Sequence, residues 1–304
     1  MKPIETTAII GVGALGMLFG NQLISNLGPD HISYVADDDR IKKYENSSFT
    51  INGNKVTLPL TPANQAKPVD LVIVAVKYTA LSSALETMKP CVGPDTTIIS
   101  VLNGISSEKM IGERFGHDKV IYTIAQGMDA MKFGSDLTYT KPGELCIGID
   151  NPDQQERLDL LTQYLKKGGV PFTVEAEILR RLWGKFMLNV GLNQTCMAYE
   201  TNYGGVLTPG EAHDTMIGAM REVIALSEKE GINLTEEDFN YYIDLIKTLS
   251  PQGMPSMRQD AIARRYSEVE MFAGTVREMS SGYGLAVPVN DRLYNKIKKM
   301  EAEY

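Results

Sequence analysis

The sequence predicts an α/β protein in two parts, a mainly parallel sheet with its helices followed by an all-helical part. Short apolar runs alternate with helical stretches over the first half of the chain. The run Leu71–Val76 is continuously apolar, as expected of a parallel strand covered on both faces. Beyond about Glu175 helical periodicity takes over and no convincing strand is found. The predicted boundary divides the chain into residues 1–175 and 176–304.

The expected strands of the first part are short and apolar, and most are followed by a helix. Asn52-Gly53 separates two of them and predicts a tight hairpin, because both residue types tolerate positive φ. The expected strands are Thr6–Ile10, Ile32–Ala36, Phe49–Ile51, Lys55–Thr57, Asp70–Val76, Thr97–Val101, Val120–Ala125, Glu144–Ile149 and Val170–Val174. Helices are expected from Gly16 to about Leu27 and near Leu81–Met88, Ser107–Phe115 and Gln154–Lys166.

The second part shows apolar residues at helical spacing, interrupted at Gly204-Gly205, Gly231 and Ser250–Pro255. Ser256 with Gln259 matches a capping box, which predicts that a helix begins there. The expected helices are Ile178–Tyr199, Pro209–Glu230, Thr235–Leu249, Ser256–Tyr283 and Asn290–Glu303.

Composition limits the classes of function. The 304 residues are 43% apolar and 22% charged, with a net charge of −8, which disfavours a nucleic-acid binder. The few cysteines and histidines are scattered, so we expect neither a disulfide framework nor a metal site. Outside the N-terminal glycine-containing stretch, the longest apolar run is far too short to span a bilayer. We therefore expect a cytoplasmic protein without a membrane partner. The scattered cysteines and histidines are Cys91, Cys146, Cys196, His31, His117 and His213.

A glycine turn follows the first expected strand and opens a helix. Its sequence is Gly11-Val12-Gly13-Ala14-Leu15-Gly16, a GxGxxG pattern in the context of a Rossmann-type dinucleotide-binding domain. Gly11 permits the tight turn, Gly13 lets the backbone approach a pyrophosphate, and Gly16 lets helix and strand pack closely. We expect these six residues to bind a dinucleotide; the alternative is a glycine-rich turn without a ligand.

The second expected strand ends at Asp37. An acidic residue there accepts hydrogen bonds from the adenosine ribose 2′-hydroxyl and repels a 2′-phosphate, which favours NAD(H). Arg40 could instead bend back to a phosphate. For Asp38 and Asp39, a polar turn with solvated charges is an equally good interpretation.

Further segments resemble one family. They are Val74-Ala75-Val76-Lys77, Leu102-Asn103-Gly104, Trp183-Gly184-Lys185 with Asn189 and Asn193, Ser256-Met257-Arg258-Gln259-Asp260, Glu268, and Val287-Pro288 with Asn290. Together with the glycine turn they resemble the ketopantoate reductases (2-dehydropantoate 2-reductases) over nearly the whole chain. The resemblance implies a Rossmann-type domain followed by a helical domain. It also implies reduction of 2-dehydropantoate to pantoate, usually with NADPH, on the route to pantothenate and coenzyme A.

The resemblance also implies roles for single residues. Two would be catalytic, four would hold the substrate, and two would contact the cofactor; Asn103 belongs to both of the last two groups. Lys185 would be the general acid and Glu268 would bind near the substrate hydroxyl. Asn189 and Asn193 would hydrogen-bond the substrate, Ser256 would hold its carboxylate, Asn103 would lie between cofactor and substrate, and Lys77 would contact the cofactor.

The residues themselves support part of this interpretation. Lys185, Asn189 and Asn193 are spaced four apart, so they share one helix face. Their apolar neighbours indicate a largely buried helix, which favours a site over a solvated polar stripe. An ammonium can stabilise the negative charge that develops on a ketone oxygen and donate the proton.

The remaining residues also have purely structural interpretations: a helix cap for Ser256, a surface charge in an ordinary helix for Glu268, a strand-end lysine for Lys77 and a plain turn for Asn103.

Two departures from the family leave alternatives open. Gln194-Thr195-Cys196-Met197 stands where the family commonly has Pro-Leu-Thr-Ala, in a segment that helps to shape the substrate pocket. Asp37 stands where NADPH-dependent members usually carry a basic residue. Reduction of another branched 2-keto acid is therefore an alternative, and a non-catalytic dinucleotide-binding regulator is a third. Asn202 could be a further substrate asparagine. The expected partner is a small keto acid, and a homodimer is compatible with the sequence.

Overall fold

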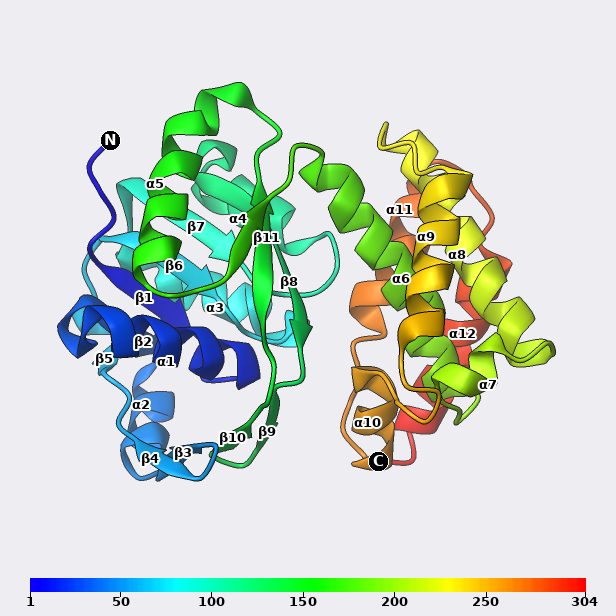
Figure 1. Cartoon of the computed structure of the whole chain (residues 1–304), viewed down its shortest axis with the longest axis horizontal. Coiled ribbons are helices and arrows are strands. Elements are labelled where there is room, and N and C mark those ends of the chain that lie inside the picture. The colour runs from blue at the N-terminus through cyan, green and yellow to red at the C-terminus, as the bar shows by residue number, and fades with distance from the viewer. The chain divides into compact units, whose positions relative to one another are not determined.

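The computed structural model describes all 304 residues and divides into two compact units. The first comprises Met1–Asn103 and Ser107–Ile178, and the second comprises Gly104–Ser106 and Leu179–Tyr304. The first unit contains all the strands and the second is helical (Figure 1). This confirms the predicted fold class. None of the helices combines the length and the apolar character needed to cross a membrane.

The first unit is built on an eight-stranded sheet. Its strands are β1 Thr7–Ile10, β2 Ile32–Ala36, β5 Leu60–Pro62, β6 Val69–Val74, β7 Val92–Ser100, β8 Val120–Met128, β11 Pro142–Gly148 and β12 Phe172–Val174. Their spatial order is β12-β11-β8-β7-β6-β1-β2-β5. β1 lies between β2 and β6 and is parallel to both, and β11 is antiparallel to β8. The chain therefore reverses its direction of progress across the sheet at β1, where open α/β sheets bind ligands.

Each face of this sheet carries its own core, because successive side chains of a strand point to opposite faces. In β1, Ile9 belongs to one core while Ala8 and Ile10 belong to the other. The first core is covered by α1 Ala14–Leu27 and α5 Gln155–Lys167. The second is covered by α3 Leu81–Met88 and α4 Ser107–Phe115, behind the sheet in Figure 1.

A second, four-stranded sheet was only half expected. The hairpin of β3 Phe49–Ile51 and β4 Asn54–Val56 is present, with φ of 49° at Asn52 and 80° at Gly53. The other half, β9 Met131–Phe133 and β10 Asp136–Thr138, was not predicted. β10 pairs with β3, far away in the sequence. Three-residue strands with few buried side chains carry too little periodicity to be recognised.

The helical unit contains α6 Ile178–Ala198, α7 Tyr203–Leu207, α8 Glu211–Lys229, α9 Glu236–Thr248, α10 Ser256–Ile262, α11 Thr275–Gly282 and α12 Pro288–Glu301. No strand follows β12, as the sequence predicts. The expected break at Gly204-Gly205 lies instead inside the short helix α7. Asn202 caps that helix, because its side chain accepts a hydrogen bond from the Gly205 N–H at 2.9 Å.

The single helix expected over Ser256–Tyr283 is wrong. α10 ends after seven residues, with Arg264 at φ 51°. The Arg265 N–H bonds the Asp260 carbonyl at 2.9 Å and the Arg264 N–H bonds the Ala261 carbonyl at 3.0 Å. This is a Schellman ending with arginine in the left-handed position that glycine usually fills. Because no glycine stands at position 264, the sequence pattern does not indicate that the helix ends there.

The capping box at the start of α10 is also wrong. Pro255 occupies the cap position, Ser256 is the first helical residue, and no side chain caps the helix. The Gln259 side chain donates to the Met254 carbonyl at 3.0 Å. A capping box does form at α9, where Thr235 and Asp238 bond each other's backbone N–H groups.

Candidate functional site

The predicted cofactor residues of the first unit follow four neighbouring parallel strands. Asp37 follows β2, the glycine turn follows β1, Lys77 follows β6 by three residues, and Asn103 follows β7 by three. The carboxyl ends of parallel strands lie at one edge of the sheet, so these segments are brought to the same edge. Residues separated by up to 92 positions in the chain thereby become neighbours in strand order.

The glycine turn requires glycine at two of its positions. Gly11 has φ of 114°, and a Cβ on it would lie 2.5 Å from the Ala75 carbonyl oxygen. A Cβ on Gly16 would lie 2.1 Å from the Gly11 carbonyl oxygen, so the turn and the first turn of α1 are in direct contact. A Cβ on Gly13 would meet nothing closer than 3.4 Å. Gly13 therefore leaves open space in front of the backbone, as close approach by a ligand requires.

The amino end of α1 is suited to a negatively charged group. Gly13 is its cap residue, no side chain caps the helix, and its first turn contains no acidic residue. The positive end of the helix dipole is therefore not neutralised by the chain's own side chains. From β2, the buried Tyr34 donates to the Gly16 carbonyl at 3.0 Å and holds the helix against the sheet. These features fit the pyrophosphate of a dinucleotide.

Asp37 has a local role besides any contact with a ribose. It is the cap residue of α2 Asp38–Glu45, where its Oδ1 accepts from the Arg40 N–H at 2.8 Å. The Arg40 guanidinium Nε lies 3.6 Å from the Asp37 Oδ2. Asp38 and Asp39 therefore form the first turn of a helix, not the polar turn considered from the sequence. Acidic side chains favour that position because of the helix dipole.

Lys77 and Asn103 lie beyond the ends of their strands. The Lys77 side chain is exposed, and its backbone is extended before the short 3-10 turn Tyr78–Ala80. Asn103 is half-buried. Gly104, which follows it, has φ of 87° and belongs to the helical unit. There, a Cβ on Gly104 would lie 2.8 Å from the Met271 side chain, so only glycine fits between the two segments.

Helix α6 carries the predicted catalytic lysine and two predicted substrate residues along one face. Lys185 is half-buried, and Asn189 and Asn193 are only 8% and 7% exposed. Neither amide side chain makes a hydrogen bond within the helical unit. Neither side chain has a fully buried polar atom that lacks a partner, so both amides reach solvent and are suited to receive a polar ligand. The Trp183 and Phe186 rings pack edge to face at 5.9 Å on the apolar side of the helix.

Gly184, beside Lys185, is required for packing. A Cβ on it would lie 2.5 Å from the Tyr242 ring of α9. The Tyr242 hydroxyl donates to the Arg181 carbonyl at 3.4 Å, which ties the ring to the same helix. The close contact between α6 and α9 therefore fixes the helix immediately around Lys185.

Glu268 lies in a bend, not in an ordinary helix as expected. It precedes the π-helical turn η7 Glu270–Gly274, and its carbonyl accepts from the N–H groups of Met271 and Phe272. A π turn inside helical structure often occurs at functional sites. Ser256 is exposed at the start of α10, a helix too short to supply a strong dipole.

The three cysteines, Cys91, Cys146 and Cys196, form no disulfide. All three are free and buried, and burial raises the pKa of Cys91 to about 11 and that of Cys196 to about 12. No group of three or more histidine, cysteine, aspartate or glutamate side chains is arranged to hold a metal ion.

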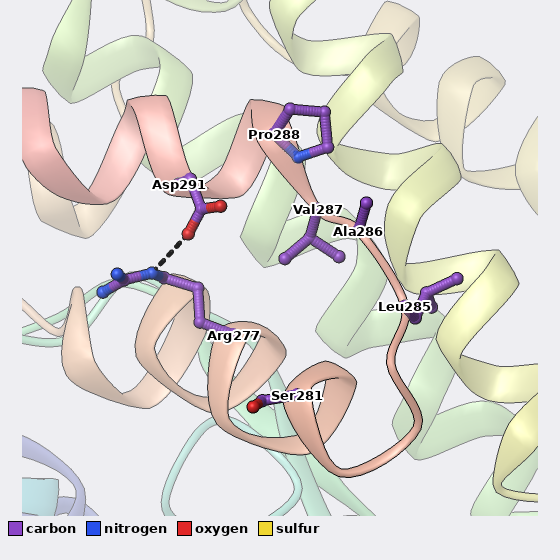
Figure 2. Close-up of a pocket in the computed structure, with 7 residues that line it drawn as sticks. All are labelled: Arg277, Ser281, Leu285, Ala286, Val287, Pro288 and Asp291. Atoms are coloured by element: carbon purple, nitrogen blue, oxygen red, sulfur yellow. Dashed lines mark hydrogen bonds and ion pairs between the residues drawn. The ribbon is translucent and has the colours of Figure 1, made fainter.

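One cavity of the helical unit lies away from the predicted residues. It measures about 420 Å³ and opens between α11 and α12 (Figure 2). Its two charged groups neutralise each other, because the Arg277 Nε bonds the Asp291 carboxylate at 2.6 Å. The remaining lining residues are Ser281, Leu285, Ala286, Val287 and Pro288. The cavity therefore offers a ligand little unpaired charge.

Comparison with known proteins identifies the family. The model described as "Ketopantoate reductase PanE/ApbA" matches residues 7–148, and "Ketopantoate reductase PanE/ApbA C terminal" matches residues 177–301. A 2-dehydropantoate 2-reductase of Streptococcus pyogenes is 23% identical over 299 residues, covering 97% of each chain. 

Two solved structures share the fold. D-mandelate dehydrogenase with NADH and anilino(oxo)acetate has a TM-score of 0.85 at 20% identity, over 98% of both chains. A dimeric ketopantoate reductase of Staphylococcus aureus has a TM-score of 0.78 at 19% identity, over 98% of this chain and 99% of that one. On the two family models, which together cover most of its length, this chain belongs to the ketopantoate reductase family of nicotinamide-dependent oxidoreductases.

Proposed function

We propose that this protein reduces the ketone of a 2-keto acid, with 2-dehydropantoate as substrate and pantoate as product, in the synthesis of pantothenate and coenzyme A. Residues 1–175 bind the dinucleotide, and residues 176–304 supply the substrate and catalytic groups. Family membership and the names of the curated relatives support this assignment. The observation that carries it is the row of Lys185, Asn189 and Asn193 on α6, with two buried amides that lack a partner within their unit.

The dinucleotide is proposed to lie across the edge of the sheet where β2, β1, β6 and β7 end. The N–H groups at the start of α1 bind its pyrophosphate, with Gly13 leaving the necessary space and Gly16 allowing the helix to pack against Gly11. Val12, Ala14 and Leu15 complete the turn, Lys77 contacts the cofactor, and Asn103 orients it toward the substrate. When bound in reduced form, the nicotinamide supplies the hydride.

The chain's own residues are proposed to handle the charge and the proton. The Lys185 ammonium donates a hydrogen bond and then a proton to the ketone oxygen, where negative charge develops during reduction. Asn189 and Asn193 hold polar groups of the substrate, and Ser256 binds its carboxylate. Glu268 accepts a hydrogen bond from the substrate hydroxyl and fixes its orientation.

We propose NADH as the preferred cofactor, against the NADPH usual for the family. Asp37 lies directly after β2 and presents a carboxylate, which accepts from a 2′-hydroxyl and repels a 2′-phosphate. Arg40 is paired with that same carboxylate. The structural relative with D-mandelate dehydrogenase activity was solved with NADH, which is compatible with this preference.

Turnover by the purified protein tests the proposal. We expect oxidation of NADH with 2-dehydropantoate, and a fall in kcat of about 100-fold or more for Lys185→Met, since general acids typically contribute that much. Lys166→Ala, on an exposed face of α5, is the matched control and should behave as wild type. Unchanged turnover in Lys185→Met would rule out the lysine's role.

An alternative substrate is favoured by two observations. Gln194 to Met197 differs from the family, and the fold of D-mandelate dehydrogenase matches this chain over 98% of its length. A panel of branched and aromatic 2-keto acids, compared by kcat/KM, distinguishes these substrates from 2-dehydropantoate. Cofactor binding without turnover on any of them would indicate a dinucleotide-binding regulator instead.

Sedimentation of the same sample tests a homodimer, the state named for the Staphylococcus aureus relative.

A further inference from the structure

The π turn η7 has an N–H group that its own helix cannot satisfy in the usual way. In an α-helix the Val269 carbonyl would accept from Ala273, four residues on. Here the Gly274 N–H occupies that carbonyl at 2.9 Å, and the Phe272 N–H bonds Glu268 at 3.2 Å. The Ala273 N–H is thereby displaced, at a residue with no exposed surface. A buried N–H of this kind needs an acceptor from elsewhere.

Gln194 of α6 supplies that acceptor. Its Oε1 lies 3.0 Å from the Ala273 nitrogen, and the residue is completely buried. Its Nε2 donates to the Val190 carbonyl at 2.8 Å, within its own helix. The amide orientation is therefore determined from both ends: the oxygen must face an N–H and the nitrogen a carbonyl. The side chain connects two segments that are 79 residues apart in the sequence.

The same network extends to α12 and α8. The Gln194 Nε2 also lies 3.4 Å from the Oδ1 of Asn290, which is completely buried. The Asn290 amide donates in turn to the Glu222 carboxylate at 2.8 Å, and that carboxylate accepts the Val289 N–H at 2.7 Å. Gln194 is thus held by α12, which is itself fixed to α8.

The turn is also held on its outer side. The Tyr294 hydroxyl of α12 donates to the Glu270 carboxylate at 2.9 Å. The Arg277 guanidinium stacks on the Tyr294 ring, 4.1 Å from its centre, and pairs with Asp291 across the cavity in Figure 2. Contacts from α6 and from α12 therefore fix both ends of η7.

We infer that Gln194 is a positioning residue. It sets the orientation of Glu268 relative to Asn193, the residue that precedes Gln194 in the sequence. The inference rests on the proposed function, in which both Glu268 and Asn193 bind the substrate. Without the Gln194 oxygen, the Ala273 N–H regains an acceptor if the turn becomes α-helical. An α turn holds one residue fewer than a π turn. The change would therefore rotate the chain that precedes the turn, including Glu268, by about 100° about the helix axis.

Gln194→Met tests the inference, because it preserves length and removes the acceptor. Ser227→Ala is the matched control: the Ser227 hydroxyl is also completely buried and accepts a backbone N–H, from Leu234 at 3.2 Å. Both variants lose some stability. We expect only Gln194→Met to lower kcat, by about 10- to 100-fold, since small misplacements of reacting groups have effects of that size. The Kd for NADH should stay within about twofold of wild type in both.

Hydrogen exchange measured by mass spectrometry provides a readout independent of turnover. Gln194→Met should speed exchange in the peptide covering Glu268–Gly274, whereas Ser227→Ala should speed it near Leu234 only. Unchanged exchange at Glu268–Gly274 overturns the inference. If wild type turns over no 2-keto acid, the proposed function fails, while the exchange result still decides whether Gln194 holds the turn.

A double-mutant cycle identifies the group through which Gln194 acts. In a Glu268→Gln background, Gln194→Met should lower kcat by less than about twofold, because the carboxylate that it positions is already removed. Additive losses, or an unchanged kcat in Gln194→Met alone, would show that Gln194 only stabilises the fold.

Discussion

The Asp37 carboxylate accepts a hydrogen bond from the Arg40 N–H at 2.8 Å, at the point where β2 gives way to α2. One oxygen caps the helix, while the second lies 3.6 Å from the Arg40 side chain. The residue that would distinguish the two nicotinamide cofactors is therefore also a structural residue. Any test of its role in selectivity must separate charge from capping.

Asp37→Asn makes that separation, because asparagine caps helices as well as aspartate does but carries no charge. We expect the ratio of the NADPH Kd to the NADH Kd to fall by about 10-fold or more, the size of one charge-assisted hydrogen bond. Fluorescence titration with each cofactor measures it. Asp37→Ala should change the ratio similarly and also lower the free energy of unfolding by about 1 kcal/mol. An unchanged ratio in Asp37→Asn would leave Asp37 as a helix cap only.

Gly16→Ala should destabilise the first unit and weaken dinucleotide binding together. The new Cβ would meet the Gly11 carbonyl oxygen at 2.1 Å, and backbone atoms cannot give way as a flexible side chain can. Overpacking of this kind costs about 1–3 kcal/mol. Urea unfolding and NADH titration measure the two effects. Gly282→Ala, at a glycine of α11 whose Cβ would meet nothing within 4 Å, is the control and should be close to neutral.

Asp70 should make stability fall in acid. Burial raises its pKa, but hydrogen bonds from Lys2, Glu5 and Thr6 outweigh burial and hold the pKa below its ordinary value. A lowered pKa in the folded state gives stability that is present above the unfolded-state pKa and lost as the pH falls through the folded-state pKa. Asp70→Asn should cost roughly 1–3 kcal/mol at pH 7.

The pH dependence distinguishes this charge effect from simple loss of packing. The difference in unfolding free energy between wild type and Asp70→Asn should shrink as the pH falls from about 5 toward 2, because both side chains are then neutral. Urea unfolding across that range measures it. A difference that does not change with pH would show that the charge of Asp70 contributes nothing.

Gly184→Ala should lower turnover through packing. The added Cβ would lie 2.5 Å from the Tyr242 ring and push α6 away from α9 beside Lys185. We expect kcat to fall by about 10-fold, with the Kd for NADH unchanged. Combining it with Tyr242→Ala should restore part of the loss, since the ring that clashes is removed. If the double variant loses as much as the two single variants together, the contact is not the cause.

Short-range patterns account for what the sequence predicted well. The Asn52-Gly53 hairpin, the glycine turn and the spacing of Lys185, Asn189 and Asn193 each depend on residues within a few positions of one another. The end of α10 was missed for the opposite reason. It depends on Arg264 at φ 51°, a left-handed conformation that the presence of an arginine does not predict.

By itself the sequence determined the fold class, the conformation of the glycine turn and the identity of the polar residues on α6, because periodicity and turn chemistry act locally. Only the tertiary structure decided which of those residues are held and by what. The capping role of Asp37 required a helix that the pattern did not reveal. The bond between Gln194 and Ala273 joins atoms 79 residues apart, and no local pattern records a hydrogen bond across that separation.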